Sequence, residues 1–217
     1  MTKEPDRAIL LFRFFQHILY CVVAGKVSVS IMSQSVAVQQ NVSVKSLAKM
    51  AMCLAVISVS AYIAFPLPFT PAMIVAATAA MCFTAFVLTP KQTFMTLVAY
   101  LILGGLAGVP ILPGGTGGLG RLFGPTGGFY FAFVVAYTLV SYFKGNNNSL
   151  KRYIIVSILI SLPITYIGGL ISMMLVLNIG LEAAIAQAVL PFIPGDVVKC
   201  ILGAFIGVRV NKALGSE

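Results

Sequence analysis

The sequence predicts an all-α integral membrane protein with six transmembrane helices and a Gly-rich outer loop between the third and fourth helices. Of 217 residues, 59% are hydrophobic and 9% are charged, whereas soluble domains carry about a quarter charged residues. At about 20 apolar residues per crossing, the chain has room for about five to seven spans. We therefore expect one membrane domain, residues 46–212, between a basic N-terminal extension, residues 1–45, and a tail, residues 213–217.

Six hydrophobic runs define the expected helices. They occupy residues 47–65, 72–89, 93–109, 127–143, 153–178 and 196–211. Basic residues lie in alternate connections and at the end of the chain, namely Lys45 and Lys49, Lys91, Lys144, Lys151 and Arg152, and Lys212. Connections rich in Lys and Arg stay in the cytoplasm. The pattern therefore predicts a multi-pass protein of the cell membrane with both termini cytoplasmic.

The first 45 residues allow more than one interpretation. Residues 8–24 are hydrophobic enough for a seventh span, but Arg13 and His17 would then lie at membrane depth, which is unfavourable without partners. No small-residue cleavage site indicates a signal peptide. Alternatively, translation begins at Met32 and leaves a short basic tail.

Composition and motifs exclude several functions. The net charge of +9 comes from scattered Lys and Arg, not from a basic stripe with interleaved aromatics, so we expect no nucleic-acid partner. Cys21, Cys53, Cys82 and Cys200 are far apart in apolar surroundings, which favours packing over a metal or redox site. No hydrolase or ATP-binding motif is present. We expect no enzyme, no cofactor and no metal.

Three charged residues lie near the predicted outer ends of the helices: Arg121, Asp196 and Lys199. Pro194 and Gly195 precede Asp196, so this segment is typical of a helix start capped by the aspartate. Lys199 follows three residues later, on the same helix face. A cap and a simple ion pair would explain both residues. Ionisable groups in membrane helices usually mark a solute path, however, so we expect Asp196 and Lys199 to bind substrate.

A Gly-rich segment occupies residues 110–128. Gly115, Gly117 and Gly120 fit a GxGxxG spacing, but no strand precedes them and a dinucleotide site is not expected. Arg121 follows the last of these glycines, where a phosphate-binding P-loop needs Lys. The segment is too irregular to cross lipid as a helix. We interpret it as a lid whose backbone approaches a small solute; a merely flexible outer loop is the alternative.

The first predicted helix carries small residues at helical spacing, with Ala51 and Ala55 forming a small-xxx-small pair. Small residues let two helices approach closely. The pair serves either internal packing or the docking of another membrane subunit, and the sequence alone does not separate these roles.

Three motifs together resemble the BioY family, the biotin-binding S components of energy-coupling-factor (ECF) transporters. They are PLPFTP at 66–71, GVPILPGGTGGLGRLFGPTGG at 108–128 and LPFIPGDVVK at 190–199. The resemblance, which covers about residues 46–212, implies a six-helix subunit in membrane lipid that captures biotin at the outer face. The implied partners are a transmembrane coupling protein and two ABC-type ATPases that hydrolyse ATP. It also implies that Asp196 and Lys199 contact the ligand under the Gly-rich loop, and that Ala51 and Ala55 dock on the coupling protein.

Biotin has a ureido ring with two N–H donors and one carbonyl acceptor, which Asp196 and Lys199 complement. The other expected substrate-binding residues are Thr78, Gly115, Thr116, Gly118, Phe129 and Tyr130, and the apolar ring has Leu112 and Phe123 as further candidates. One departure concerns the second helix, where the family commonly has Gln followed by Thr or Asn and this chain has Ala77-Thr78. Two alternatives remain: a structural or assembly membrane subunit that binds no solute and, with the least support, a membrane enzyme.

Overall fold

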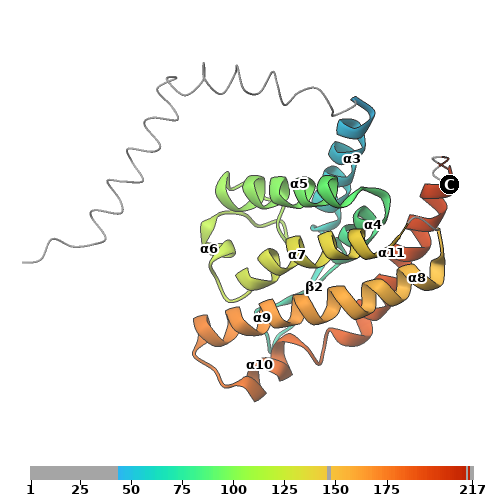
Figure 1. Ribbon diagram of the computed structural model, residues 1–217. Helices are drawn as coiled ribbons and strands as arrows, with labels where there is room; N and C mark the ends of the chain where they lie inside the picture. The colour runs from blue at the N-terminus through green and yellow to red at the C-terminus, as the bar shows by residue number, and fades with distance from the viewer. Residues whose placement is uncertain (1–43, 146–147, 214, 216–217) are drawn as a thin grey trace, which may run out of the picture. The chain divides into compact units, whose positions relative to one another are not determined.

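The computed structural model describes residues 44–145, 148–213 and 215, and it is mostly helical (Figure 1). The possible span at residues 8–24 and Met32 lie outside the described residues, as does all of the predicted N-terminal extension except Val44 and Lys45. From Leu47 on, the described residues form one compact unit.

The first two hydrophobic runs form helices that are shorter than predicted. Helix α3 spans Val44–Ser60 and helix α4 spans Ala77–Val87. Between them, β1 (Ala64–Pro66) pairs with β2 (Met73–Val75) in an antiparallel hairpin. The predicted helices 47–65 and 72–89 are therefore wrong where they approach each other, since the first ends at Ser60 and the second begins at Ala77. Prolines at 66, 68 and 71 interrupt helical hydrogen bonding, so the apolar residues beside them become extended.

The third run forms helix α5 (Pro90–Leu101), which continues into a π-helical turn, η1 (Ile102–Leu106). A capping box starts α5: the Thr89 side chain accepts from the backbone of Gln92, and the Gln92 side chain accepts from the Thr89 N–H. Pro90 stands at the first helical turn, where its missing N–H leaves no bond unmade. A short helix, α6 (Leu119–Leu122), then interrupts the Gly-rich segment.

The C-terminal half contains the longest helices. Helix α7 spans Gly127–Phe143, and α8 (Leu150–Val156), η2 (Ser157–Ser161) and α9 (Leu162–Leu177) follow each other as one rod (Figure 1). The π-helical turn η2 directly precedes Pro163, whose ring disrupts regular α-helical bonding. Helix α10 spans Leu181–Ala188, and α11 spans Ile193–Ala213.

Length and composition identify one helical rod in the described part of the chain that could cross a membrane, Leu150–Leu177. A second is counted if Leu181–Ala188 and Ile193–Ala213, which are bent by 46°, form one broken span. The apolar helices α4 and α7 have 11 and 17 residues, fewer than the 18 taken as the minimum for a membrane span. The number of six spans therefore remains a prediction.

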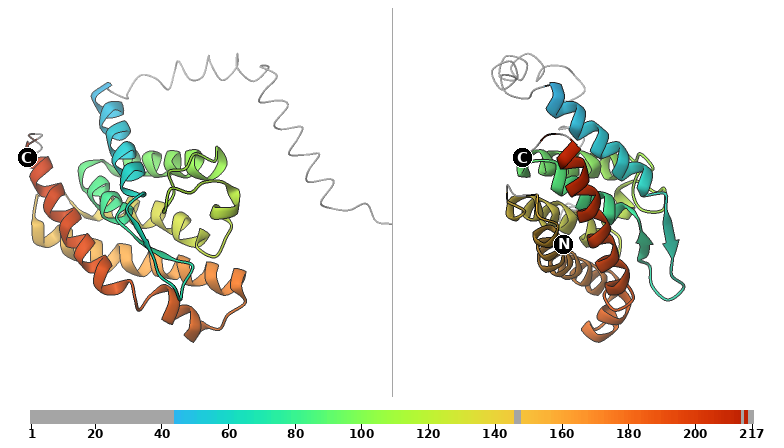
Figure 2. Two further views of the ribbon diagram at one scale, coloured as in Figure 1. Left: turned by 180° about the vertical axis from the view of Figure 1, so that it is seen from behind. Right: turned by 90° about the vertical axis from the view of Figure 1, so that its right-hand side faces the viewer.

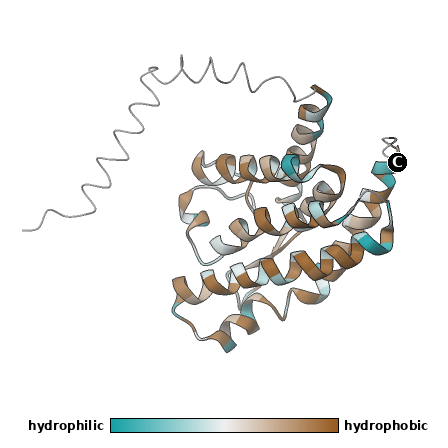
Figure 3. Cartoon of the chain, in the orientation of Figure 1, coloured by the Kyte–Doolittle hydropathy of each residue, from teal (hydrophilic) through white to brown (hydrophobic). Residues whose placement is uncertain are grey.

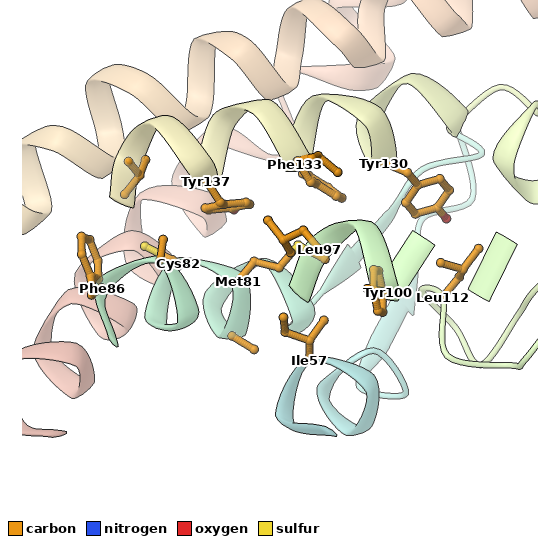
Figure 4. Close-up of a cluster of buried hydrophobic side chains, with 14 of the residues drawn as sticks. Ile57, Met81, Cys82, Phe86, Leu97, Tyr100, Leu112, Tyr130, Phe133 and Tyr137 are labelled. Atoms are coloured by element: carbon orange, nitrogen blue, oxygen red, sulfur yellow. The ribbon is translucent and has the colours of Figure 1, made fainter. Parts of the chain in front are cut away.

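Close helix contacts at glycines hold the unit together. A Cβ added at Gly128 of α7 would lie 2.0 Å from the carbonyl oxygen of Gly168 on α9, so the two backbones touch. Gly203 of α11 likewise faces Cys82 of α4. In membrane proteins, small residues at helix contacts let the two backbones approach closely. The buried core lies between α4, α5 and α7 (Figure 4).

Most residues of the helices are hydrophobic (Figure 3), and many large hydrophobic side chains are exposed. On α9, Ile167, Ile171 and Leu175 form a stripe with side chains 57%, 54% and 73% exposed. Contiguous apolar surface of this kind is rare on soluble monomers and typical of a surface in contact with lipid or protein.

A basic end forms where α4, α7 and α11 finish and α8 begins. The Lys144 ammonium donates to the carbonyl oxygens of Ala85, Phe86 and Leu88, which are the last acceptors of α4. Asn211 of α11 donates to Phe86 O and to the Tyr153 hydroxyl. A cation and an amide thus satisfy carbonyls that a helix C-terminus leaves free.

Candidate solute-binding site

A pocket of about 760 Å³, including its open mouth, lies at the other end of α11, where α7 begins and α9 continues. The hairpin contributes Pro71, Ala72 and Met73 to its wall. The hairpin tip and α10 lie at the same end of the helices in both views of Figure 2. Its lining is mostly apolar with a few polar groups, as is typical of small-molecule sites.

Asp196 and Lys199 both line this pocket and form an ion pair, with Lys199 Nζ 2.9 Å from Asp196 Oδ1. The Lys199 side chain is 15% exposed and the Asp196 side chain is 16% exposed. The other carboxylate oxygen, Oδ2, accepts a hydrogen bond of 3.0 Å from the Tyr166 hydroxyl of α9. The carboxylate is therefore held from two helices, and its remaining lone pairs are available to a ligand.

The predicted role of Asp196 as a helix cap is wrong. Helix α11 begins at Ile193, and the Asp196 N–H already donates to Phe192 O at 2.8 Å. The preceding turn from Val189 to Ile193 extends the helical path into α11, so no cap is needed at Asp196. The side chain is thereby free to turn toward Lys199 and Tyr166.

Thr78, one of the predicted substrate-binding residues, lines the pocket, and its hydroxyl donates to Val75 O at 3.1 Å. Because this bond uses the only hydroxyl proton, Thr78 can offer a ligand only an acceptor. Ala77 is 1% exposed and does not reach the pocket surface. The wall formed by α4 is consequently poor in polar groups.

The Gly-rich segment contributes Pro113, Arg121 and Thr126 to the pocket lining. Gly115, Thr116 and Gly118, predicted to contact substrate, do not line the pocket, whereas Arg121 does. Arg121 Nε donates to Thr116 Oγ1 at 3.1 Å. Gly118 has a φ of +97°, which favours glycine, and its N–H donates to Gly104 O at 2.7 Å. In this conformation the turn holds the Arg121 side chain, and the backbone N–H of Gly118 points away from the pocket, toward Gly104.

Aromatic side chains from one helix supply the apolar wall. Phe129, Tyr130, Phe133 and Tyr137 of α7 all line the pocket. Figure 4 shows Tyr130, Phe133 and Tyr137 along the same side of the helix. The predicted candidates Leu112 and Phe123 do not line it; Leu112 is fully buried in the core, and Phe123 is 68% exposed.

The charged residues that line the pocket are Arg121, Lys199 and Asp196, so the lining carries one excess positive charge. The Asp196–Lys199 pair is internally neutral, which leaves Arg121 as the group able to compensate an anion. Guanidinium groups bind carboxylates in a bidentate geometry. The arrangement suits a solute with a neutral polar head at one end and a carboxylate at the other.

Two pocket residues carry roles that sequence reasoning did not assign. Arg121 was recognisable as the single charge of its segment, but nothing indicated that it lines the same pocket as Asp196 and Lys199. Tyr166 lies 30 residues before Asp196 inside an apolar run, so only the packing of α9 against α11 identifies it.

Ala51 and Ala55 do not line this pocket. They lie on an exposed face of α3, whereas Cys53 and Ile57 are buried on another face. The two alanines are therefore not packed inside the described part of the chain. Their exposure is consistent with the docking interpretation. Among the described residues, no group of three or more His, Cys, Asp or Glu could hold a metal ion.

Comparisons with known proteins agree on one family. The chain matches the BioY family over residues 27–216. It is 31% identical over 178 residues to biotin transporter BioY2 of Lactococcus lactis subsp. cremoris (strain MG1363), covering 81% of this chain and 94% of that protein. It is also 31% identical over 150 residues to the probable biotin transporter BioY of Bacillus subtilis (strain 168), covering 68% and 80%.

A solved structure supports the fold. The crystal structure of the S-component for biotin from an ECF-type ABC transporter superposes with a TM-score of 0.71 at 29% identity, covering 78% of this chain and 92% of that chain. The family match begins at residue 27, so the prediction that the first 45 residues lie wholly outside the resemblance is wrong. The motifs, the helical fold and the matched length lead to one conclusion: the chain belongs to the BioY family.

Proposed function

We propose that this chain is the biotin-binding S component of an ECF-type transporter and that biotin occupies the pocket around Asp196 and Lys199. The observation that carries the proposal is the neutral, partly buried Asp196–Lys199 pair in a pocket whose other charged lining residue is Arg121. Relatives described as biotin transporters and a solved S component for biotin support the choice of solute.

The pocket chemistry suggests how biotin lies in it. The ureido N–H groups donate to Asp196, and the ureido carbonyl accepts from Lys199. The apolar ring and tail pack on Phe129, Tyr130 and neighbouring α7 aromatics, and the carboxylate reaches Arg121. The ureido head of biotin is uncharged and the ion pair is neutral overall, so their contact buries no unpaired charge.

The topology proposed for the membrane places this pocket at the outer face and the basic end in the cytoplasm. Lys144, Lys151 and Lys212 support it, because positively charged connections remain inside. In this arrangement residues 46–212 form the six-helix membrane domain, both termini are cytoplasmic, and the Gly-rich segment covers the pocket from outside.

The proposed partners are a transmembrane coupling protein and two ABC-type ATPases. Energy then comes from ATP hydrolysis in the partners. Exposed Ala51 and Ala55 form the proposed docking face, since small residues permit close contact with another helix. An assembly subunit that uses the same face without a solute is the alternative, and the charged pocket argues against it.

Uptake of labelled biotin tests the proposal. Cells that lack their own biotin transporter are supplied with the coupling protein and ATPases, with or without this chain. We expect ATP-dependent accumulation of biotin only when this chain is present, and excess unlabelled biotin should abolish the signal. Equal uptake without the chain would contradict the proposed role.

A further inference from the structure

Two reduced cysteines from different helices meet beside the pocket. Cys82 of α4 and Cys200 of α11 are 1% and 3% exposed, and both lie where these two helices pack against each other. They are separated by 118 residues, as the difference between their numbers shows. Their contact therefore depends on the packing of α4 against α11.

The helix contact explains why the thiols are so close. Gly203 lies three residues after Cys200, on the same face of α11. A Cβ at Gly203 would be 2.9 Å from Cys82 Cβ and 3.2 Å from Cys82 Sγ. The missing side chain lets the two backbones approach, which a disulfide between helices requires.

The two thiols differ in access. Cys200 lines the pocket, and its Sγ lies 3.9 Å from Ser161 Oγ; Cys82 lies behind it and does not line the pocket. Figure 4 shows Cys82 in the buried cluster near Tyr137, a residue that lines the pocket floor. A small reagent that enters the pocket thus meets Cys200 first and Cys82 second.

We propose that Cys82 and Cys200 form a dithiol that a hydroperoxide oxidises to a disulfide between α4 and α11. The Cys200 thiolate attacks the peroxide, the O–O bond breaks, and a sulfenic acid forms at Cys200 with release of water or an alcohol. The Cys82 sulfur then attacks the Cys200 sulfur, the S–O bond breaks, and the sulfenic oxygen leaves as water. Two electrons pass from the thiols to the peroxide, and both thiol protons end in the oxygen products.

Peptide mapping after oxidation tests this proposal on the full-length chain in detergent. The Cys21→Ser/Cys53→Ser background retains only the two cysteines of interest. After hydrogen peroxide treatment and alkylation, we expect an intramolecular peptide pair joined through Cys82 and Cys200, a mass loss of two hydrogens, and no thiol left to alkylate. Dithiothreitol should restore both thiols.

Single substitutions provide the controls. Cys53 is also buried and reduced but lies on α3, so Cys53→Ser alone should leave the cross-link unchanged. Cys82→Ser and Cys200→Ser should each abolish it. The proposal is overturned if folded protein retains both thiols, if the disulfide joins two chains, or if Cys200 is oxidised to the sulfinic acid while Cys82 stays reduced.

Ligand protection adds an arm that depends on the proposed function. If biotin fills the pocket, saturating biotin should slow disulfide formation, because it covers Cys200. Cross-linking that proceeds at the same rate with and without biotin would contradict biotin occupancy of this pocket but would leave the dithiol assignment intact. Absence of cross-linking in both conditions would overturn the dithiol alone.

Discussion

The Tyr166 hydroxyl donates a hydrogen bond of 3.0 Å to Asp196 Oδ2, which joins α9 to α11 at the wall of the pocket. Lys199 occupies the other oxygen of the same carboxylate at 2.9 Å. The carboxylate is thus oriented before any solute arrives. Preorganisation of this kind lowers the entropy lost on binding.

Replacing Tyr166 by Phe should weaken biotin binding about tenfold, because a hydrogen bond to a charged group contributes about 1.5 kcal/mol and its loss frees the carboxylate to rotate. Isothermal titration measures the change. Tyr142→Phe, on an exposed tyrosine of α7, should have no effect.

A double-mutant cycle separates positioning from general structural damage. In the Asp196→Asn background, Tyr166→Phe should cause little further loss, since the two residues act through one contact. Fully additive losses would mean that Tyr166 does not act through Asp196.

Arg121→Gln should weaken binding of biotin about tenfold or more, because a charge-assisted contact to the carboxylate is lost. Biotinamide, which has no carboxylate, should bind wild type and Arg121→Gln with the same affinity. If the substitution weakens both ligands equally, Arg121 supports the fold of the pocket instead. If neither changes, the carboxylate lies elsewhere, with Lys199 as the next candidate.

Ala51→Trp should leave biotin binding unchanged and abolish uptake by the complete transporter, because a bulky side chain blocks close helix contact with the coupling protein. Binding is measured on purified protein and uptake in cells. Leu175→Trp, on an apolar side chain of α9 that is 73% exposed, serves as the control and should retain both activities. Loss of biotin binding in Ala51→Trp would contradict the docking role.

We predict that the free energy of unfolding depends on pH through Lys144, at the basic end. Burial lowers the pKa of Lys144 from 10.5 to about 8. Between these values the unfolded chain binds more protons than the folded one, so the free energy of unfolding should rise as pH increases from about 8 to about 10.5. Below pH 8 Lys144 is protonated in both the folded and the unfolded state, so it does not make the free energy of unfolding change with pH.

Thermal unfolding in detergent from pH 7 to 10 measures this effect. The rise should be smaller in Lys144→Met, whereas Lys151→Met, at an exposed lysine, should retain the wild-type slope. Identical slopes in all three proteins would show that Lys144 does not titrate in this range.

Much of the helical organisation was predictable because long apolar runs leave few alternatives. The Asp196–Lys199 pair was predictable too, since residues three apart share a helix face. The hairpin at 64–66 and 73–75 was missed because its residues are as apolar as the adjacent helices, and periodicity does not separate short apolar strands from helix ends.

The contacts made by Tyr166, Arg121 and the Cys82–Cys200 pair were not predictable. The Tyr166–Asp196 bond and the Cys82–Cys200 pair each join helices far apart in the chain, and Arg121 reaches the pocket only through the fold of the Gly-rich segment. The sequence shows these residues but contains no local pattern that pairs them. Asp196 was assigned as a cap because Pro194 and Gly195 resemble a helix start, although the helical path already begins before them.

Titration of purified protein with biotin tests the central claim most directly. The account predicts saturable binding of one biotin per chain, and a loss of about 2 kcal/mol or more, roughly 30-fold in affinity, in Asp196→Ala, which leaves Lys199 unpaired. Glu182→Ala, at an exposed acidic residue of α10, should bind as wild type. Folded protein that shows no saturable biotin binding, or unchanged affinity in Asp196→Ala, would contradict it.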